Sequence, residues 1–154
     1  MATRLFLKLG DIKGTSKDAK NHKDWIEIES FSYGVANSVN TTEKAKGNPG
    51  GEACNHSDIS LNKVIDKTSP LFYAHCSSGK IFDKATIECC EEEELLFRLN
   101  LTNAAVSSAS VGGGTGGVPT ESLSLSFSKV AWQYKTEAEL FWDQVTNSGS
   151  LKKK

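Results

Sequence analysis

The 154-residue chain lacks both a long apolar run and an excess of charge of one sign. A transmembrane helix needs about 18 or more consecutive apolar residues, and the sequence contains no such run. Lys and Arg total 18 against 19 Asp and Glu, for a formal net charge of -1. Nucleic-acid binding needs clustered basic side chains. We therefore expect neither membrane insertion nor nucleic acid as a main partner.

The first residues, MATRLFLKLGD, also lack the apolar core of a secretory signal peptide. We therefore expect the protein to be made and folded in the cytoplasm. It then either stays there or leaves the cell by a route that reads no cleavable signal.

Cysteines are few, and their spacing does not match a known framework. The four are Cys54, Cys76, Cys89 and Cys90. A reducing compartment disfavours disulfides, so we expect free thiols. Cys54 with His56 and His75 with Cys76 offer zinc-ligand atoms, but structural zinc sites use C-x2-4-C or H-x3-5-H spacing. We expect no metal ion and no other cofactor.

Catalytic signatures are missing as well. The chain has three histidines, and no G-x-S-x-G elbow surrounds any serine. Asp58 is near enough in sequence to orient His56, which leaves a small hydrolase as one hypothesis. A surface histidine on a β-protein explains the same residues more simply, so we expect no enzymatic activity.

Alternation of apolar and polar residues is the strongest positive pattern. A period of two predicts strands with one buried face. The expected strands cover residues 4–9, 25–35, 54–64, 81–90, 95–108 and 122–134. In the last of these, the large apolar positions change phase between Phe127 and Val130. This change predicts a bulge, or a strand that leaves one sheet for another.

One short helix is predicted among these strands. Ser69 is a suitable N-cap, Pro70 suits the first helical position and Gly79 can end the helix. Residues 136–145 fit either a helix or an edge strand. Local propensity favours a helix there, because Thr136 and Glu139 have the spacing of a capping box.

Three segments are expected to be loops. Residues 11–23 are polar and predict an exposed loop, and the glycine-rich residues 112–117 predict a flexible connection between strands. Residues 36–53 carry no large side chain except Val39. A loop of that length without core residues is usually functional or mobile, so we expect an arm that reaches a neighbouring subunit.

Taken as residues alone, the chain predicts a single domain over residues 1–154, mainly β, that assembles with itself. A monomeric β-sandwich that binds a sugar or a peptide is the alternative.

Nine short motifs sharpen this prediction. In chain order they are HKDWIE at 22–27, FSYGV at 31–35, HSD at 56–58, DKTSP at 66–70, GK at 79–80, VSS at 106–108, PTES at 119–122, VAWQY at 130–134 and WD at 142–143. Together they resemble the Hcp family, the haemolysin co-regulated proteins that form the tube of the bacterial type VI secretion system. Two features depart from the family pattern: the acidic residues 91–94 and the cysteines.

The resemblance implies a two-sheet antiparallel β-barrel with one short α-helix packed at its side, similar to phage tail tubes. It implies six copies in a ring and rings stacked into a tube, which a contracting sheath expels with a spike at its tip. Small effector proteins would be carried inside the ring. It also implies export without a signal peptide and no turnover of substrate.

The resemblance also assigns roles by position. Residues 39–51 should contact the next ring or a neighbouring subunit, and residues 95–106 and 122–134 should build the sheet that closes the ring. The residues expected to make the arm contacts are Val39, Asn40, Thr41, Thr42, Glu43, Lys44, Lys46 and Asn48. Ser107, Ser108 and Ser110 are candidates for the lumen or for a subunit interface.

Overall fold

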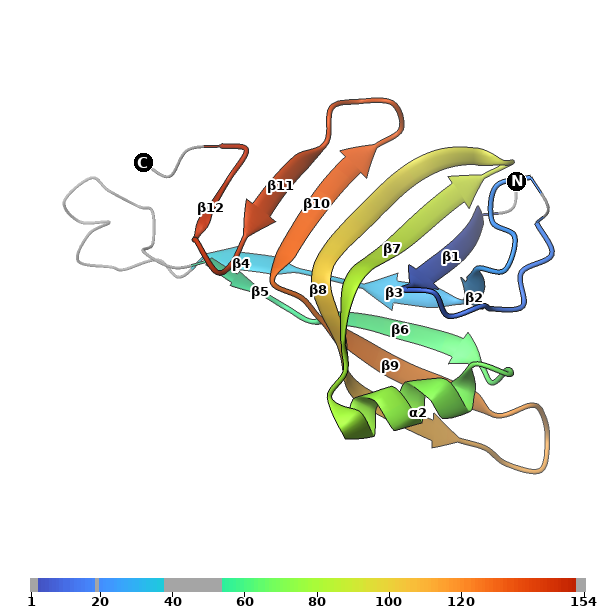
Figure 1. Ribbon diagram of the computed structural model, residues 1–154. Helices are drawn as coiled ribbons and strands as arrows, with labels where there is room; N and C mark the ends of the chain where they lie inside the picture. Colours follow the sequence, from blue (N-terminus) through green and yellow to red (C-terminus); the bar gives the residue numbers. More distant parts are fainter. Residues whose placement is uncertain (1–2, 19, 38–53, 152–154) are drawn as a thin grey trace.

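The computed structural model describes residues 3–18, 20–37 and 54–151 (Figure 1). The elements are β1 (Thr3–Leu9), β2 (Ile26–Ile28), β3 (Ser30–Ser32), β4 (Val35–Asn37), β5 (Cys54–His56), β6 (Ile59–Val64), α2 (Ser69–Ser78), β7 (Ile81–Glu91), β8 (Glu94–Gly112), β9 (Thr120–Ser126), β10 (Lys129–Tyr134), β11 (Leu140–Asp143) and β12 (Ser148–Gly149). The described part of the chain is therefore mainly β with one short helix, as predicted. No helix in it has the length and apolar content to span a membrane.

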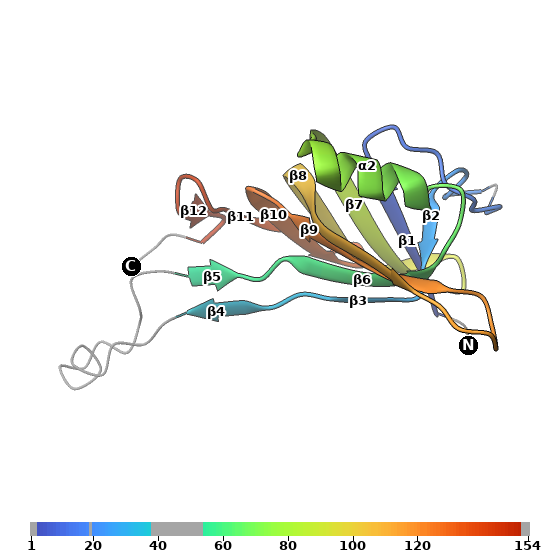
Figure 2. The same ribbon diagram turned by 90° about the horizontal axis from the view of Figure 1, so that it is seen from below.

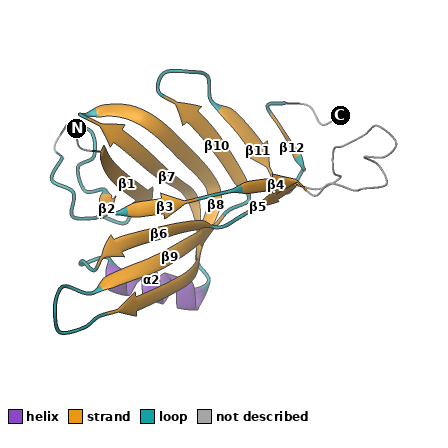
Figure 3. Cartoon of the chain, turned by 180° about the vertical axis from the view of Figure 1, so that it is seen from behind, coloured by secondary structure: helices purple, strands orange, loops and turns teal. Residues whose placement is uncertain are grey.

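The strands pair antiparallel in two directions from β8 (Figures 1 and 3). One path runs β12-β11-β10-β8-β7-β1-β2, and the other runs from β8 through β9 and β6 to β3. Glu29 alone separates β2 from β3, so the two paths meet along one continuous segment. The strands thus surround a common core.

The 19-residue strand β8 belongs to both paths. Its first part pairs with β7 and β10, and its last part pairs with β9. The register shifts between Val106 and Ser108, which marks a bulge where the strand changes partners. A bulge bends a strand, so β8 can pair with the strands of both paths.

The predicted phase change before Val130 is confirmed. Here too the chain changes its partner strands. β9 ends at Ser126 and β10 begins at Lys129, after a break at Phe127 and Ser128. Leu125 in β9 and Val130 in β10 are both 0% exposed, although their positions are out of phase for one continuous strand. β9 lies between β6 and β8 in one strand path, whereas β10 lies between β8 and β11 in the other.

The core is closed on one side by the helix (Figure 2). α2 contacts β8, and Phe72 of the helix is 0% exposed among the core strands. Gly79 ends the helix with a left-handed φ of 71°, as predicted. The predicted N-cap is displaced by one residue: Thr68 occupies that position, and Ser69 is buried as the first helical residue.

The prediction of an exposed loop at residues 11–23 is wrong in part, because Ser16 and His22 are buried. The imidazole of His22 stacks on Phe6 of β1, with ring centroids 4.0 Å apart. Phe6 points away from the main core and would otherwise be exposed, so the loop covers it and leaves it 1% exposed. Gly14 allows this path, since an added Cβ would lie 2.3 Å from the carbonyl oxygen of Trp25.

The preference for a helix at residues 136–145 is also wrong. Residues 140–143 form β11, with Phe141 opposite Ala131 and Trp142 opposite Val130 of β10. The backbone N–H and C=O groups of β11 form hydrogen bonds with β10, and this tertiary pairing outweighs the local helix propensity.

Candidate functional site

The most extended polar surface of the described strands is formed by hydroxyl side chains, and we call it the serine face. Its members lie on the side of β3, β6, β9 and the end of β8 that points away from the core: Ser30, Ser32, Ser60, Asn62, Ser108, Ser110, Ser122 and Ser124. All are exposed except Ser124, which is half-buried. Their register is regular, with Asn62 opposite Ser30 and Ser122, and Ser124 opposite Ser60 and Ser108.

The bulge in β8 adds Ser107 to this surface. Normal alternation would turn either Ser107 or Ser108 inward, but the register shift leaves both exposed. The Ser107 and Ser108 hydroxyls each lie 2.6 Å from Ser124 Oγ. Ser107 also donates a hydrogen bond of 2.7 Å to Asp58 Oδ2. The candidates Ser107, Ser108 and Ser110 thus share one surface.

Sequence reasoning missed the contributions of β3 and β6 to the serine face. Ser30 and Ser32 flank Phe31, and Ser60 and Asn62 flank Leu61. These short polar-apolar-polar patterns match the one in β9. They were the sequence signal from which the contribution of β3 and β6 could have been predicted. Asn62 links the strands, since it donates to Ser30 at 3.1 Å and accepts from Ser122 at 2.6 Å.

Chemically, the serine face is suited to contact and not to catalysis. Its hydroxyl and amide groups are largely bonded to one another, and Asp58 supplies a carboxylate at its margin. The described residues place no histidine in hydrogen-bonding reach of these serines, so the Ser–His pair of a serine hydrolase is not formed here. Such a neutral, hydrated sheet surface fits a protein contact or the wall of a water-filled space.

A two-stranded ribbon of β4 and β5 extends from the body of the fold (Figures 1 and 2). Val35 pairs with His56 and Asn37 with Cys54, so residues 38–53 connect the two strands of the ribbon. All eight predicted arm residues, between Val39 and Asn48, lie outside the described residues. Their predicted contacts with a neighbouring subunit or ring therefore remain a prediction.

An aromatic cluster joins the base of the ribbon to β10. The Tyr33 hydroxyl lies 2.7 Å from His56 Nδ1, and His56 stacks on Trp132 with centroids 6.2 Å apart. Burial lowers the pKa of His56 and raises the pKa of Tyr33 to about 12. Both groups therefore stay neutral at physiological pH, and the cluster acts as a fixed anchor for the ribbon.

This cluster also bears on the hydrolase and zinc hypotheses. His56 Nδ1 faces Tyr33 and Nε2 lies 3.7 Å from Cys54 Sγ, whereas Asp58 bonds to Ser107. Asp58 therefore does not orient His56 through a hydrogen bond. His75 and Cys76 lie on α2, far in the fold from Cys54 and His56 on β5 (Figure 1).

Comparison with known proteins bears on this arrangement of strands, helix and ribbon. A family described as "Type VI secretion system effector, Hcp" matches residues 6–134 of the chain. The chain belongs to the Hcp family. Protein hcp1 of Pseudomonas aeruginosa is 36% identical to it over 143 residues, which cover 89% of this chain and 86% of that protein.

Solved Hcp structures share the fold. A structure described as a type six secretion system protein has a TM-score of 0.88 at 26% identity and covers 97% of this chain and 100% of its own. Hcp1 from Salmonella typhimurium has a TM-score of 0.80 at 24% identity and covers 96% of this chain and 99% of its own. The resemblance found in the sequence motifs is thereby confirmed.

Family membership settles the broad function. The chain is a type VI secretion tube protein of the Hcp family and belongs among the proteins secreted by that system. The Hcp family is structural and non-enzymatic, which confirms that the chain is not an enzyme.

Proposed function

We propose that six copies of this chain form a ring, and that the rings stack into a tube that a contracting sheath expels from the cell. The observation that carries the proposal is the match to the Hcp family over residues 6–134, together with 36% identity to hcp1. Residues 1–154 act as one tube domain in this proposal. The mechanism is mechanical: binding between copies builds the tube, and no bond of a substrate is made or broken.

The partners of the proposed tube are other copies of the chain, the sheath around it and a spike at its tip. Small effector proteins are carried in the lumen of the ring. The protein folds in the cytoplasm and reaches the outside through the type VI secretion system, without a cleaved signal peptide. A tube that is itself expelled explains both steps.

Two exposed surfaces support contacts between copies. The first is the serine face, which lines either the lumen or a subunit interface. The second is the surface of β10 and β11, next to the terminal strand β12, where Tyr134, Leu140 and Phe141 are exposed by 52%, 46% and 37%. Exposed apolar side chains that lie close together favour association with another subunit. This surface is where we place closure of the ring.

Light scattering combined with negative-stain imaging tests the ring directly. We expect particles with the mass of a hexamer and an open central hole at micromolar protein concentration. A purely monomeric protein without rings would contradict the proposal and favour the monomeric β-sandwich that binds a sugar or a peptide. Rings with a central hole would exclude that alternative.

The arm gives a second prediction. Deleting residues 41–50 should leave the subunit folded and the rings intact but weaken the stacking of rings, because this segment carries almost no core-forming side chain. Circular dichroism reports the fold, and the length distribution of tubes in negative stain reports stacking. As a control, replacing the same residues by a glycine-serine linker of equal length should have the same effect.

The result that would refute this role for the arm is specific. A deletion variant that unfolds would show that the segment contributes to the core of its own subunit. Tubes of normal length would show that stacking does not depend on it.

A further inference from the structure

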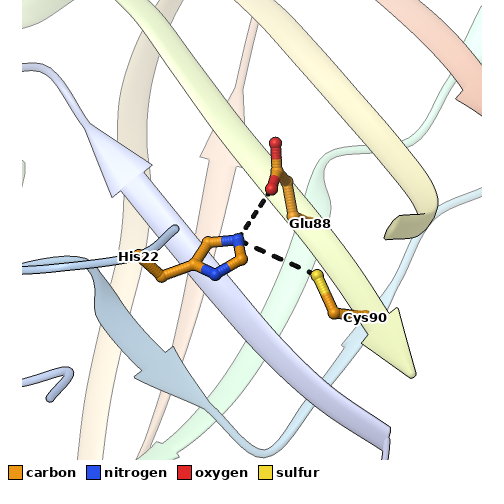
Figure 4. Close-up of side chains that lie close together, drawn as sticks. All are labelled: His22, Glu88 and Cys90. Atoms are coloured by element: carbon orange, nitrogen blue, oxygen red, sulfur yellow. Dashed lines mark hydrogen bonds and ion pairs between the residues drawn. The ribbon is translucent and has the colours of Figure 1, made fainter. Parts of the chain in front are cut away.

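A second cluster of polar side chains lies away from the serine face, where the 11–23 loop crosses β1 and meets β7 (Figure 4). His22 Nε2 is 2.7 Å from Glu88 Oε1 and 3.8 Å from Cys90 Sγ. One ligand atom from each of the three side chains lies within 4.8 Å of the others. An imidazole, a carboxylate and a thiol thus converge from two segments of the chain.

The cluster is well shielded from solvent. The His22 side chain is 4% exposed, the Glu88 side chain is 12% exposed, and Cys90 is 4% exposed. Shielding matters because it excludes the water that competes for a bound ion and fixes the side chains that would hold it.

The groups around the cluster already orient it as a metal site requires. His22 Nδ1 lies 2.8 Å from Asp18 Oδ2, and this hydrogen bond lowers the pKa of Asp18. A ligating histidine usually donates its second ring N–H to a carboxylate in this way, which directs the other nitrogen at the metal. Glu88 Oε2 accepts a hydrogen bond of 2.7 Å from Arg98, so Oε1 is the oxygen left to face His22.

We propose that His22 Nε2, Glu88 Oε1 and Cys90 Sγ bind one divalent transition-metal ion, with Zn²⁺ as the best match. Thiolate and imidazole ligands disfavour Mg²⁺ and Ca²⁺, which prefer oxygen, and suit Zn²⁺. Three protein ligands leave the fourth tetrahedral position for a water molecule. The ion would tie the loop that carries His22 to β7.

The geometry needs only a small adjustment to accept the ion. With usual Zn²⁺ bond lengths, a tetrahedral site separates the nitrogen from the oxygen by about 3.4 Å and from the sulfur by about 3.6 Å. The corresponding separations here are 2.7 and 3.8 Å. The third pair, Glu88 Oε1 and Cys90 Sγ, lies within 4.8 Å. Side-chain movements of about 1 Å therefore create the site.

Access and charge also favour a cation. A cavity of about 150 Å³ reaches His22 and Cys90, and its lining adds Phe6, the Arg4 guanidinium and the carboxylates of Asp18, Glu92 and Glu93, so carboxylates outnumber cations there. Liquid water occupies about 30 Å³ per molecule, so the cavity has room for the fourth ligand. Two of the acidic residues that depart from the family pattern, Glu92 and Glu93, thus place negative charge at the entrance to the site.

Binding must remove the proton of the Cys90 thiol. A bound cation stabilises the thiolate directly and releases the proton. Metal affinity should consequently increase with pH.

A Co²⁺ titration of the full-length protein tests the site, because a cobalt-bound thiolate has a distinct charge-transfer absorption. We expect this band to saturate at one Co²⁺ per chain and to disappear on addition of Zn²⁺. Cys90→Ala should abolish the band. Cys89→Ala is the matched control: Cys89 pairs with Leu5 and Cys90 with Arg4 of β1, so the two thiols lie on opposite faces.

Thermal unfolding gives a second test that does not depend on the cobalt absorption band. Zn²⁺ should raise the melting temperature of the wild type and of Cys89→Ala, and leave that of Cys90→Ala unchanged. If Cys90→Ala does not fold, Glu88→Gln preserves the shape of the site and should weaken Co²⁺ binding at least tenfold. Absence of the thiolate band in the wild type, or its equal loss in both cysteine variants, would overturn the proposal.

Discussion

Lys63→Met is expected to lower the free energy of unfolding by roughly 3–5 kcal/mol. Lys63 and Glu121 have side chains that are 0% exposed, with Nζ 2.7 Å from Glu121 Oε2. The same ammonium group lies 3.2 Å from Asp66 Oδ2, so two carboxylates share it. Methionine keeps the length of the side chain but leaves the buried carboxylate of Glu121 without its cation.

The position of this pair explains why the effect should be large. It lies under the first turn of α2, where Ser69 and Tyr73 both donate hydrogen bonds to Glu121. Burial and then the Glu121 carboxylate raise the pKa of Tyr73, so its hydroxyl remains a donor. Losing Lys63 therefore disturbs the contact that fixes the helix to β6 and β9.

Urea unfolding at a fixed protein concentration measures the change. The matched control is Glu27→Gln in the exposed pair of Arg4 and Glu27, whose side chains are 51% and 48% exposed. The free energy of unfolding of that variant should fall by less than about 1 kcal/mol. The double variant Lys63→Met with Glu121→Leu should recover much of the loss, because replacing a whole buried pair by apolar groups is far less costly than breaking it. If Lys63→Met unfolds at the wild-type urea concentration, the pair does not stabilise the helix.

Leu125→Asp is the second change with a large expected effect. Leu125 is 0% exposed in β9, opposite Ile59 of β6 and Val106 of β8. A carboxylate at this position has to be buried without a partner or be protonated, and either state costs free energy. We expect the free energy of unfolding to fall by about 4–5 kcal/mol, which is a large fraction of the total stability of a domain.

The control for this prediction is a charge on the opposite face of the same strand. Ser122→Asp places it on the exposed serine face. This variant loses the hydrogen bond that Ser122 donates to Asn62, so the free energy of unfolding should fall by no more than about 1.5 kcal/mol. Circular dichroism during urea unfolding compares the two variants. Equal stability of Leu125→Asp and Ser122→Asp would show that the phase of β9 has been assigned wrongly.

Alternation in the sequence predicted much of the fold because most strands have one buried face. The change of phase before Val130 marked the passage from β9 to β10, and Gly79 marked the end of the helix. Ser107, Ser108 and Ser110 lie on the serine face, and their place in the lumen or at a subunit interface stays a prediction. These features depend on neighbouring residues, which the sequence displays directly.

The features that were missed depend on contacts between distant residues. A lysine such as Lys63 is normally expected at the surface. It is buried here because it pairs with Glu121, which lies 58 positions later in the sequence. Phe6 lies on the same face of β1 as Arg4 and Lys8, and nothing near it in sequence shows that His22 covers it. The choice between helix and edge strand at residues 136–145 stayed open, and local propensity favoured the wrong one, because the hydrogen-bonding partner of β11 is β10.

The length of β8 has a mechanical consequence for the proposed tube. Its 19 residues form one backbone of roughly 60 Å that belongs to both strand paths. A force applied to the strands of one path reaches those of the other along covalent bonds, and the ladders beside β8 are loaded in shear, where many hydrogen bonds must break together. The bulge between Val106 and Ser108 interrupts the ladder with β9, so under tension the strands should first separate there.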